Sequence, residues 1–345
     1  MASLRQWFKN ARSVSLMQSL MPALLAVILA FGEDGFNIIL AVLAVIGVEA
    51  AHLCLNLSDD YFDYRSDMLS DREKIVRKGF RAMMVKYPYL TDGSETPASL
   101  KRAIASFGAA ALLCGAVIFA SRTSQFGLFG ERGSIVIVII ALVTAFLGVF
   151  YTAPPLRLAF YGLGEPVIGL IFGPLLMCGV YYACAGSLNW GIVGISIPVG
   201  LLVLNILYTH SFIEKAGDAE SGKMTLARLA GSDKSGLMLA YSINLLPFVI
   251  VGVSVACGSL HPMYLLCLAV LPRSLWLCRS LNEFSRGNTG VPDRPSRLLG
   301  PMGDWTHIRE AGIDWFMMRW LTARNILSGF CALIIIARII VLTAF

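Results

Sequence analysis

The chain has 345 residues, of which 57% are hydrophobic and only 14% are charged, and its formal net charge is +6. With a mean hydropathy of +0.70, it is too apolar for an ordinary soluble domain. The composition indicates a protein whose solvent is the lipid bilayer, and nothing in it suggests a nucleic-acid partner.

Long apolar runs recur along the sequence, and each approaches the roughly 20 residues that a helix needs to cross the hydrocarbon layer. Because backbone amides in lipid must be satisfied within the segment, such runs are helices rather than open strands. We therefore predict an all-α, polytopic membrane protein with about nine transmembrane helices, forming one domain over residues 1–345. The predicted spans are residues 16–32, 36–58, 103–121, 134–152, 163–184, 190–212, 237–257, 262–282 and 325–345.

The distribution of lysine and arginine predicts the orientation of the chain. Basic residues concentrate at the N-terminus and in four loops, whereas the alternate loops hold only Arg122 and Arg132. The positive-inside rule then predicts a cytoplasmic N-terminus and an external C-terminus, in the inner (cytoplasmic) membrane. The four basic loops lie near residues 59–102, 153–160, 213–236 and 283–324.

Two of these loops are long for a compact domain, and such loops are usually functional lids or disordered segments. Loop 59–102 begins with the densest acidic cluster of the chain, so we expect a lid there. Loop 283–324 is expected to contain an interfacial helix from Trp305 to Trp320, because tryptophans suit the headgroup boundary.

The second span runs into an acidic cluster. Asp59, Asp63 and Asp67 recur every four residues, so on a helix they form one column of carboxylates. Asn56, one turn earlier, continues the same stripe toward the membrane and is a candidate substrate contact. Stacked like charges repel unless a cation lies between them, and oxygen ligands of this kind suit Mg²⁺.

The sixth span ends in a second acidic cluster. Glu214 and Asp218 share a helix face, with His210 one turn deeper. Two carboxylate clusters on separate helices predict a clamp that holds Mg²⁺ across one diphosphate. Three basic side chains are candidates to neutralise the remaining phosphate charge, namely Lys215, Lys223 and Arg157.

A simpler explanation competes with this one, because a charged run at a membrane boundary is often just a solvated helix end. A single cluster would not decide between the two. The second cluster repeats the spacing of the first, and both are predicted on the cytoplasmic side, which favours the metal-diphosphate hypothesis.

These residues resemble motifs of the UbiA superfamily of intramembrane prenyltransferases. Asp59 to Asp67 resembles its first motif, Asn-Asp-Tyr-x-Asp-x-x-x-Asp, and Glu214 to Ala227 resembles its second, Asp-x-x-x-Asp-x-x-x-Gly-Lys-x-Thr-Leu-Ala. The segment from Tyr151 to Glu165 resembles the branch that prenylates 1,4-dihydroxy-2-naphthoate in menaquinone synthesis. The likeness covers nearly the whole chain and implies helices arranged around a central cavity.

The resemblance implies that the chain transfers a polyprenyl group from polyprenyl diphosphate to an aromatic acid. It implies phosphate contacts from Arg65, Lys223 and Arg157. The implied Mg²⁺ ligands are Asp59, Asp63, Asp67, Glu214 and Asp218. The chain departs from the family pattern where Asp59 replaces the common Asn, Glu214 the usual Asp, and His210 a common Asn.

Tyr151, Tyr161 and Glu165 are candidates for positioning the aromatic acceptor, and the ring face of Tyr151 could stabilise an allylic cation. A structural alternative for the segment from Tyr161 to Glu165 is a turn followed by a helix start, since an acid favours that end. Both explanations of this segment remain open.

Other functions are compatible with the same features. Within the superfamily, the acceptor could be 4-hydroxybenzoate or a lipid glycerol phosphate. A transporter of anions or lipids would instead use intramembrane polar residues to line a pathway.

Overall fold

The computed structural model describes residues 3–70, 87–220 and 222–344, and it confirms an all-α protein. In these residues there is no strand, only an isolated parallel bridge between Tyr161 and Met224. Seven of the described helices are long and apolar enough to cross a membrane. Two shorter apolar helices accompany them, α2 (Met17–Ala30) and α7 (Ile135–Val149). The chain is therefore a multi-pass membrane protein.

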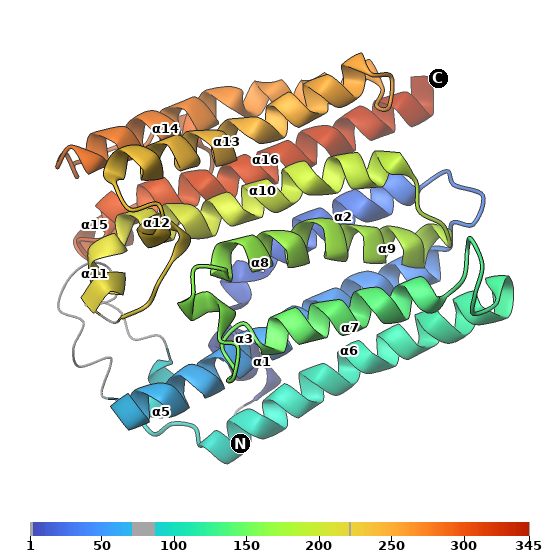
Figure 1. The fold of residues 1–345 in the computed structure, drawn as a ribbon, viewed down its shortest axis with the longest axis horizontal. Coiled ribbons are helices and arrows are strands. Elements are labelled where there is room, and N and C mark those ends of the chain that lie inside the picture. The colour runs from blue at the N-terminus through green and yellow to red at the C-terminus, as the bar shows by residue number, and fades with distance from the viewer. Residues whose placement is uncertain (1–2, 71–86, 221, 345) are drawn as a thin grey trace. The chain divides into compact units, whose positions relative to one another are not determined.

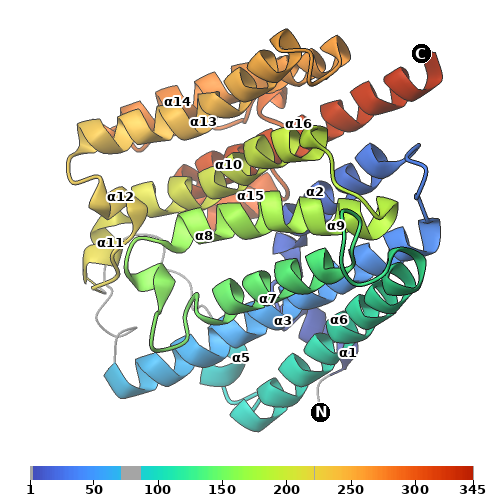
Figure 2. The same cartoon turned by 45° about the vertical axis from the view of Figure 1, so that its right-hand side comes forward.

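Figures 1 and 2 show the course of the helices along the chain. The described residues form two compact units. Unit 1 contains the described residues of 3–70, 87–157 and 171–196, and unit 2 contains those of 158–170, 197–220 and 222–344. Each unit holds one of the two acidic clusters.

Unit 1 is built on α3 (Ile38–Ser70), which runs alongside α6 (Pro97–Phe126). With 33 residues, α3 is about 50 Å long, whereas the hydrocarbon layer is only about 30 Å thick. Its last turns therefore extend beyond the apolar layer, and they carry the first acidic cluster. The other elements of this unit are α1 (Leu4–Asn10), the 3-10 turn η1 (Ser13–Leu16), α2, α5 (Pro88–Thr91), α7, the π-helical turn η4 (Ile171–Leu175) and α9 (Leu176–Ala185).

Arg122 fastens the opposite end of unit 1. It lies within α6 rather than in the loop where the sequence analysis placed it, and it is fully buried. Its guanidinium donates to the carbonyl oxygens of Ala183 at 2.8 Å, Cys184 at 2.6 Å and Gly35 at 3.1 Å. Because the last carbonyls of a helix have no intrahelical donor, Arg122 satisfies the C-terminal end of α9.

Unit 2 contains α10 (Trp190–Ile213) from residue 197 onward, packed with α13 (Asp233–Ala256). The two helices are joined by Asn205 and Asn244, whose buried amides exchange hydrogen bonds of 2.9 and 2.8 Å. Such reciprocal pairs hold helices together in lipid, where burial of apolar surface offers little. The remaining elements are η3 (Leu158–Phe160), α8 (Gly164–Leu170), α11 (Lys215–Glu220), α12 (Leu226–Leu229), the 3-10 segment η5 (Pro262–Val270), α14 (Leu271–Ser285), η6 (Arg297–Leu299), α15 (Trp305–Glu310) and α16 (Asp314–Ala344).

The two long loops are shorter than the sequence predicted. α3 continues to Ser70, and α6 begins at Pro97, where Thr96 and Ser99 form a reciprocal capping box. The single helix predicted from Trp305 to Trp320 is wrong. Helix α15 ends shortly before Gly312, which has a positive φ of 67°. Helix α16 then starts at Asp314, an acid that suits a helix N-terminus.

Candidate active site

The first acidic cluster lies where α3 leaves the apolar layer. Asp59 and Asp63 are separated by one turn of an uninterrupted helix, so both project from one face, and both are half-buried. Asp67 lies one turn further along α3, but its side chain is outside the described residues. Arg65 is exposed, with its guanidinium carbon 5.9 Å from the centre of the Tyr61 ring.

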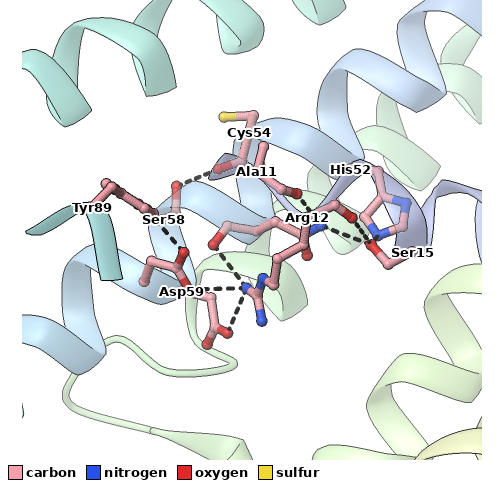
Figure 3. A network of polar contacts seen from close by, with 10 residues as sticks. Ala11, Arg12, Ser15, His52, Cys54, Ser58, Asp59 and Tyr89 are labelled. Carbon is pink, nitrogen blue, oxygen red and sulfur yellow. Dashed lines mark hydrogen bonds and ion pairs between the residues drawn. The ribbon is translucent and has the colours of Figure 1, made fainter. Parts of the chain in front are cut away.

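Arg12 connects the N-terminal segment to this cluster (Figure 3). Its Nη2 lies 3.2 Å from Asp59 Oδ2, 3.1 Å from Asp60 Oδ1 and 3.0 Å from the Asn56 carbonyl oxygen. Partial burial lowers the pKa of Arg12, but the adjacent Asp60 and Asp59 carboxylates outweigh it and raise the pKa above its ordinary value. Arg12 also has a left-handed backbone, with φ 57°, which is uncommon outside glycine. A charged guanidinium is thus held against the base of the acidic column.

Asp60 is the deepest carboxylate of the cluster, with no exposed surface. The hydroxyl of Tyr89, in α5, donates to Asp60 Oδ2 at 2.9 Å. Burial, followed by the Asp60 carboxylate, raises the pKa of Tyr89 well above its ordinary value, so the phenol stays protonated and donates. Asp60 therefore joins the residues around α5 and the N-terminal segment to α3.

Asn56, predicted to bind substrate, instead donates to the Ala11 carbonyl oxygen at 3.0 Å and to Ser15 Oγ at 3.1 Å. One turn deeper, the His52 ring bonds to Ser19 Oγ at 2.7 Å, and Figure 3 shows it beside Ser15. Both side chains of α3 are thus used to attach the segment from Ala11 to Ser19. A substrate contact by Asn56 remains a prediction.

The second acidic cluster lies where α10 passes through one turn into α11. Glu214 and Asp218 are each only 1% exposed, and the Asp218 amide donates to the Glu214 carbonyl oxygen at 2.8 Å. The helical spacing therefore continues through the turn, and the two carboxylates lie on one face as predicted. His210 is one turn deeper, and its ring meets the Phe316 ring edge-on at 5.1 Å.

The basic residues near the second cluster have different surroundings. Lys215 Nζ donates to the Gly231 carbonyl oxygen at 3.0 Å and to Asp233 Oδ1 at 2.9 Å, which joins α11 to the start of α13. These contacts use two of the three Nζ protons, so a phosphate would share the Lys215 ammonium with Asp233. The Lys223 amide donates to the Asp218 carbonyl oxygen at 3.0 Å, so Lys223 is held beside the cluster by its backbone.

The segment from Tyr151 to Glu165 is divided between the two units. Tyr151 is half-buried just after α7, and Arg157 has a positive φ of 44° beyond the cis bond between Pro154 and Pro155. Both belong to unit 1. Tyr161, which is 64% exposed, and Glu165, which is buried, belong to unit 2. The candidates for acceptor positioning are thus divided between the two units.

The donor sets fit Mg²⁺ in kind. Each cluster offers a pair of carboxylates one helical turn apart, and Mg²⁺ commonly takes one or two carboxylates while substrate phosphates complete its shell. Among the described residues, no group of three or more His, Cys, Asp or Glu side chains forms a metal cage. The residues present therefore suit a metal that shares its shell with a phosphate ligand.

Sequence reasoning missed Arg12 and Tyr89 at the first cluster and Ser211 at the second. From the sequence, Arg12 counts only among the basic N-terminal residues that predict the orientation of the chain. It lies 47 residues from Asp59 in the chain. The single available signal was a basic residue directly before the first span, and that signal names no partner.

Comparison with known proteins gives a consistent result. The model of the UbiA prenyltransferase family matches residues 19–289. The chain is 26% identical over 262 residues to 1,4-dihydroxy-2-naphthoate octaprenyltransferase of Bacillus subtilis, covering 76% of this chain and 77% of that protein. It is 31% identical over 142 residues to 2-carboxy-1,4-naphthoquinone phytyltransferase of Synechocystis, covering 41% of this chain and only 46% of that protein.

Solved structures share the fold at low sequence identity. A structure solved in a study of digeranylgeranylglyceryl phosphate synthase in membranes superposes on this chain with a TM-score of 0.60 and 14% identity. The match covers 97% of this chain and 98% of that one. A UbiA homolog from Archaeoglobus fulgidus bound to GPP and Mg²⁺ gives a TM-score of 0.55 at 14% identity, covering 95% and 99%.

Proposed function

The chain belongs to the UbiA prenyltransferase family, and from this membership we propose that it prenylates 1,4-dihydroxy-2-naphthoate in menaquinone biosynthesis. It is a membrane-embedded prenyltransferase. The observation that carries the choice of acceptor is the match to the Bacillus subtilis naphthoate octaprenyltransferase over about three quarters of both chains. The donor is a polyprenyl diphosphate, consistent with the GPP that the Archaeoglobus fulgidus homolog binds.

The four described carboxylates of the two clusters would hold Mg²⁺ against the diphosphate, and Asp67 would join them. When bound, Mg²⁺ neutralises the diphosphate and makes it a better leaving group. Arg65, Lys223 and Arg157 would contact the phosphates, the arginines through the planar fork of their guanidinium groups and Lys223 through its ammonium group. The described carboxylates are Asp59, Asp63, Glu214 and Asp218.

Transfer then follows from the charges that the chain supplies. The allylic C–O bond breaks, the diphosphate leaves with the bonding electrons, and the electron-rich ring attacks the cation. A new C–C bond forms at the ring carbon that carries the carboxylate, the bond to the carboxylate breaks, and CO₂ leaves while the electrons of that bond restore the aromatic ring. The apolar helices exclude the water that would otherwise capture the cation, and the ring face of Tyr151 would stabilise it.

The site requires access to a cytoplasmic diphosphate. We place the N-terminus and both acidic clusters on the cytoplasmic side of the inner membrane, with the C-terminus external, because lysine and arginine concentrate on that side.

Incubating purified protein with Mg²⁺, a labelled prenyl diphosphate and a panel of acceptors tests this proposal. We expect labelled prenylated product from 1,4-dihydroxy-2-naphthoate, with release of CO₂ from its carboxyl group, and no product without Mg²⁺. Transfer to 4-hydroxybenzoate or to a glycerol phosphate lipid, with none to the naphthoate, would show that the acceptor is wrong while the reaction class stands. No transfer to any acceptor would contradict the prenyltransferase assignment itself.

A further inference from the structure

The carboxylate of Glu165 links two segments that flank the second acidic cluster. Glu165 is 4% exposed, and its Oε1 accepts a hydrogen bond of 2.5 Å from Ser211 Oγ on α10. Both of its oxygens lie 3.3 Å from the backbone nitrogen of Leu226, which donates to them. Ser211 precedes Glu214 by one helical turn, and Leu226 follows Lys223 closely in the chain. Glu165 therefore contacts the chain on both sides of the second acidic cluster, at Ser211 before it and at Leu226 after it.

The contact with Leu226 satisfies a backbone donor that needs a partner, and the contact with Ser211 is the shorter of two that are open to its hydroxyl. Leu226 begins α12, and Thr225, its N-cap residue, makes no side-chain capping bond, so the Glu165 carboxylate replaces that cap. Ser211 has one hydroxyl proton and two acceptors in range, Glu165 at 2.5 Å and the Leu207 carbonyl oxygen at 3.0 Å. The shorter bond to a charged acceptor is the stronger one.

The turn before Glu165 packs along the same segment. The Met224 amide donates to the Phe160 carbonyl oxygen at 3.2 Å, which is part of the bridge between Tyr161 and Met224. Gly162 has a positive φ of 79°, and a Cβ there would come within 2.0 Å of Leu229 Cδ1. Only glycine allows this close approach together with that backbone conformation.

From its other side, the segment is tied to the second cluster. The Lys223 amide donates to the Asp218 carbonyl oxygen at 3.0 Å, and Arg228 Nη1 donates to the Lys223 carbonyl oxygen at 2.6 Å. The backbone of Lys223 is thus held between Asp218 on one side and the turn ending at Glu165 on the other.

We propose that Glu165 is a positioning residue, which holds the Lys223 segment against the end of α10 and so sets the affinity for the prenyl diphosphate. This inference rests on the proposed function, because it takes Lys223 as a phosphate contact. It assigns Glu165 to the donor half of the reaction and not to the aromatic acceptor. The geometry supports that choice, since both Glu165 oxygens are already engaged by Ser211 and Leu226.

Steady-state kinetics separate the two roles. In Glu165→Ala, the KM for prenyl diphosphate should rise about tenfold. In Ser211→Ala it should rise less, because only the hydrogen bond between Ser211 and Glu165 is lost. The KM for the aromatic acceptor should stay within about twofold of the parent. Ser242→Ala is the matched control, because Ser242 makes the same bond to the carbonyl one turn back, at 2.9 Å, on the exposed face of α13.

Limited trypsin digestion in detergent provides a readout that does not depend on turnover. Cleavage after Lys223 should be faster in Glu165→Ala and in Ser211→Ala than in the parent and in Ser242→Ala. Equal cleavage in all four proteins would overturn the proposal, whatever their activities.

A raised KM for the acceptor with an unchanged KM for prenyl diphosphate would also overturn the proposal, and it would place Glu165 at the acceptor. If the parent transfers no prenyl group, the proposed function fails, and the digestion alone then decides whether Glu165 holds the segment. If Glu165→Ala does not fold, the milder Ser211→Ala carries both measurements.

Discussion

Arg12→Gln tests whether the N-terminal segment is fixed through the first acidic cluster. The substitution removes the guanidinium that lies 3.1 Å from Asp60 and 3.2 Å from Asp59. Asp60 would then keep the Tyr89 hydroxyl but lose its counter-charge while having no exposed surface. Removing one partner of a buried ion pair costs about 3–5 kcal/mol. Because the Arg12 side chain is 35% exposed, solvent screening reduces this, and we expect a loss of about 2 kcal/mol.

A thermal unfolding assay in detergent measures this loss. For 345 residues, with an unfolding entropy of about 2.1 cal/mol/K per residue, about 2 kcal/mol corresponds to a fall in Tm of roughly 3 °C. The control is Arg5→Gln, which removes an exposed arginine from α1 and should leave the Tm unchanged. Equal Tm values for Arg12→Gln and Arg5→Gln would refute the argument.

A double-mutant cycle identifies the cause of the loss. Adding Asp60→Asn to Arg12→Gln removes the uncompensated charge while leaving Tyr89 an oxygen to donate to. The double variant should therefore lose less stability than the sum of the two single variants, by about 1–2 kcal/mol. Additive losses would mean that Arg12 stabilises the protein through contacts other than Asp60.

Three further predictions concern the clusters and the topology. Asp63→Ala and Asp218→Ala should each abolish prenyl transfer at saturating Mg²⁺ while the protein stays folded in detergent; near-parental turnover by either variant would contradict the two-cluster hypothesis. Glu214→Asp should reduce transfer and be partly rescued by the larger Mn²⁺, and Glu214→Gln should be worse, because it loses the charge; parental turnover by Glu214→Gln at every Mg²⁺ level would leave Glu214 a structural acid. The exposed Cys257 should react with an impermeant maleimide from outside the cell, whereas Asp92→Cys in a Cys257→Ser background should not, and the opposite pattern would reverse the orientation.

The two acidic columns were predictable from the sequence because they depend on local geometry alone. A residue one helical turn from another lies on the same face of any helix, so Asp59 with Asp63 and Glu214 with Asp218 needed only the correct helix assignment. The structure keeps the first pair within α3, which runs further than expected, to Ser70, and it keeps the second pair across the turn between α10 and α11. The apolar spans were predictable for the same reason, since bilayer thickness sets the length of each run.

By itself, then, the sequence determined an all-α membrane protein, its approximate spans and the carboxylates within each cluster. The tertiary structure alone decided what holds those carboxylates in place. Arg12 lies 47 residues from Asp59, and Ser211 lies 46 from Glu165. Contacts at such separations depend on how helices pack, and no periodicity along the chain encodes that. For the same reason, the sequence used Arg12 only to predict the side of the membrane. The position of a basic residue in the chain indicates that side, but it does not identify the carboxylates that the residue contacts.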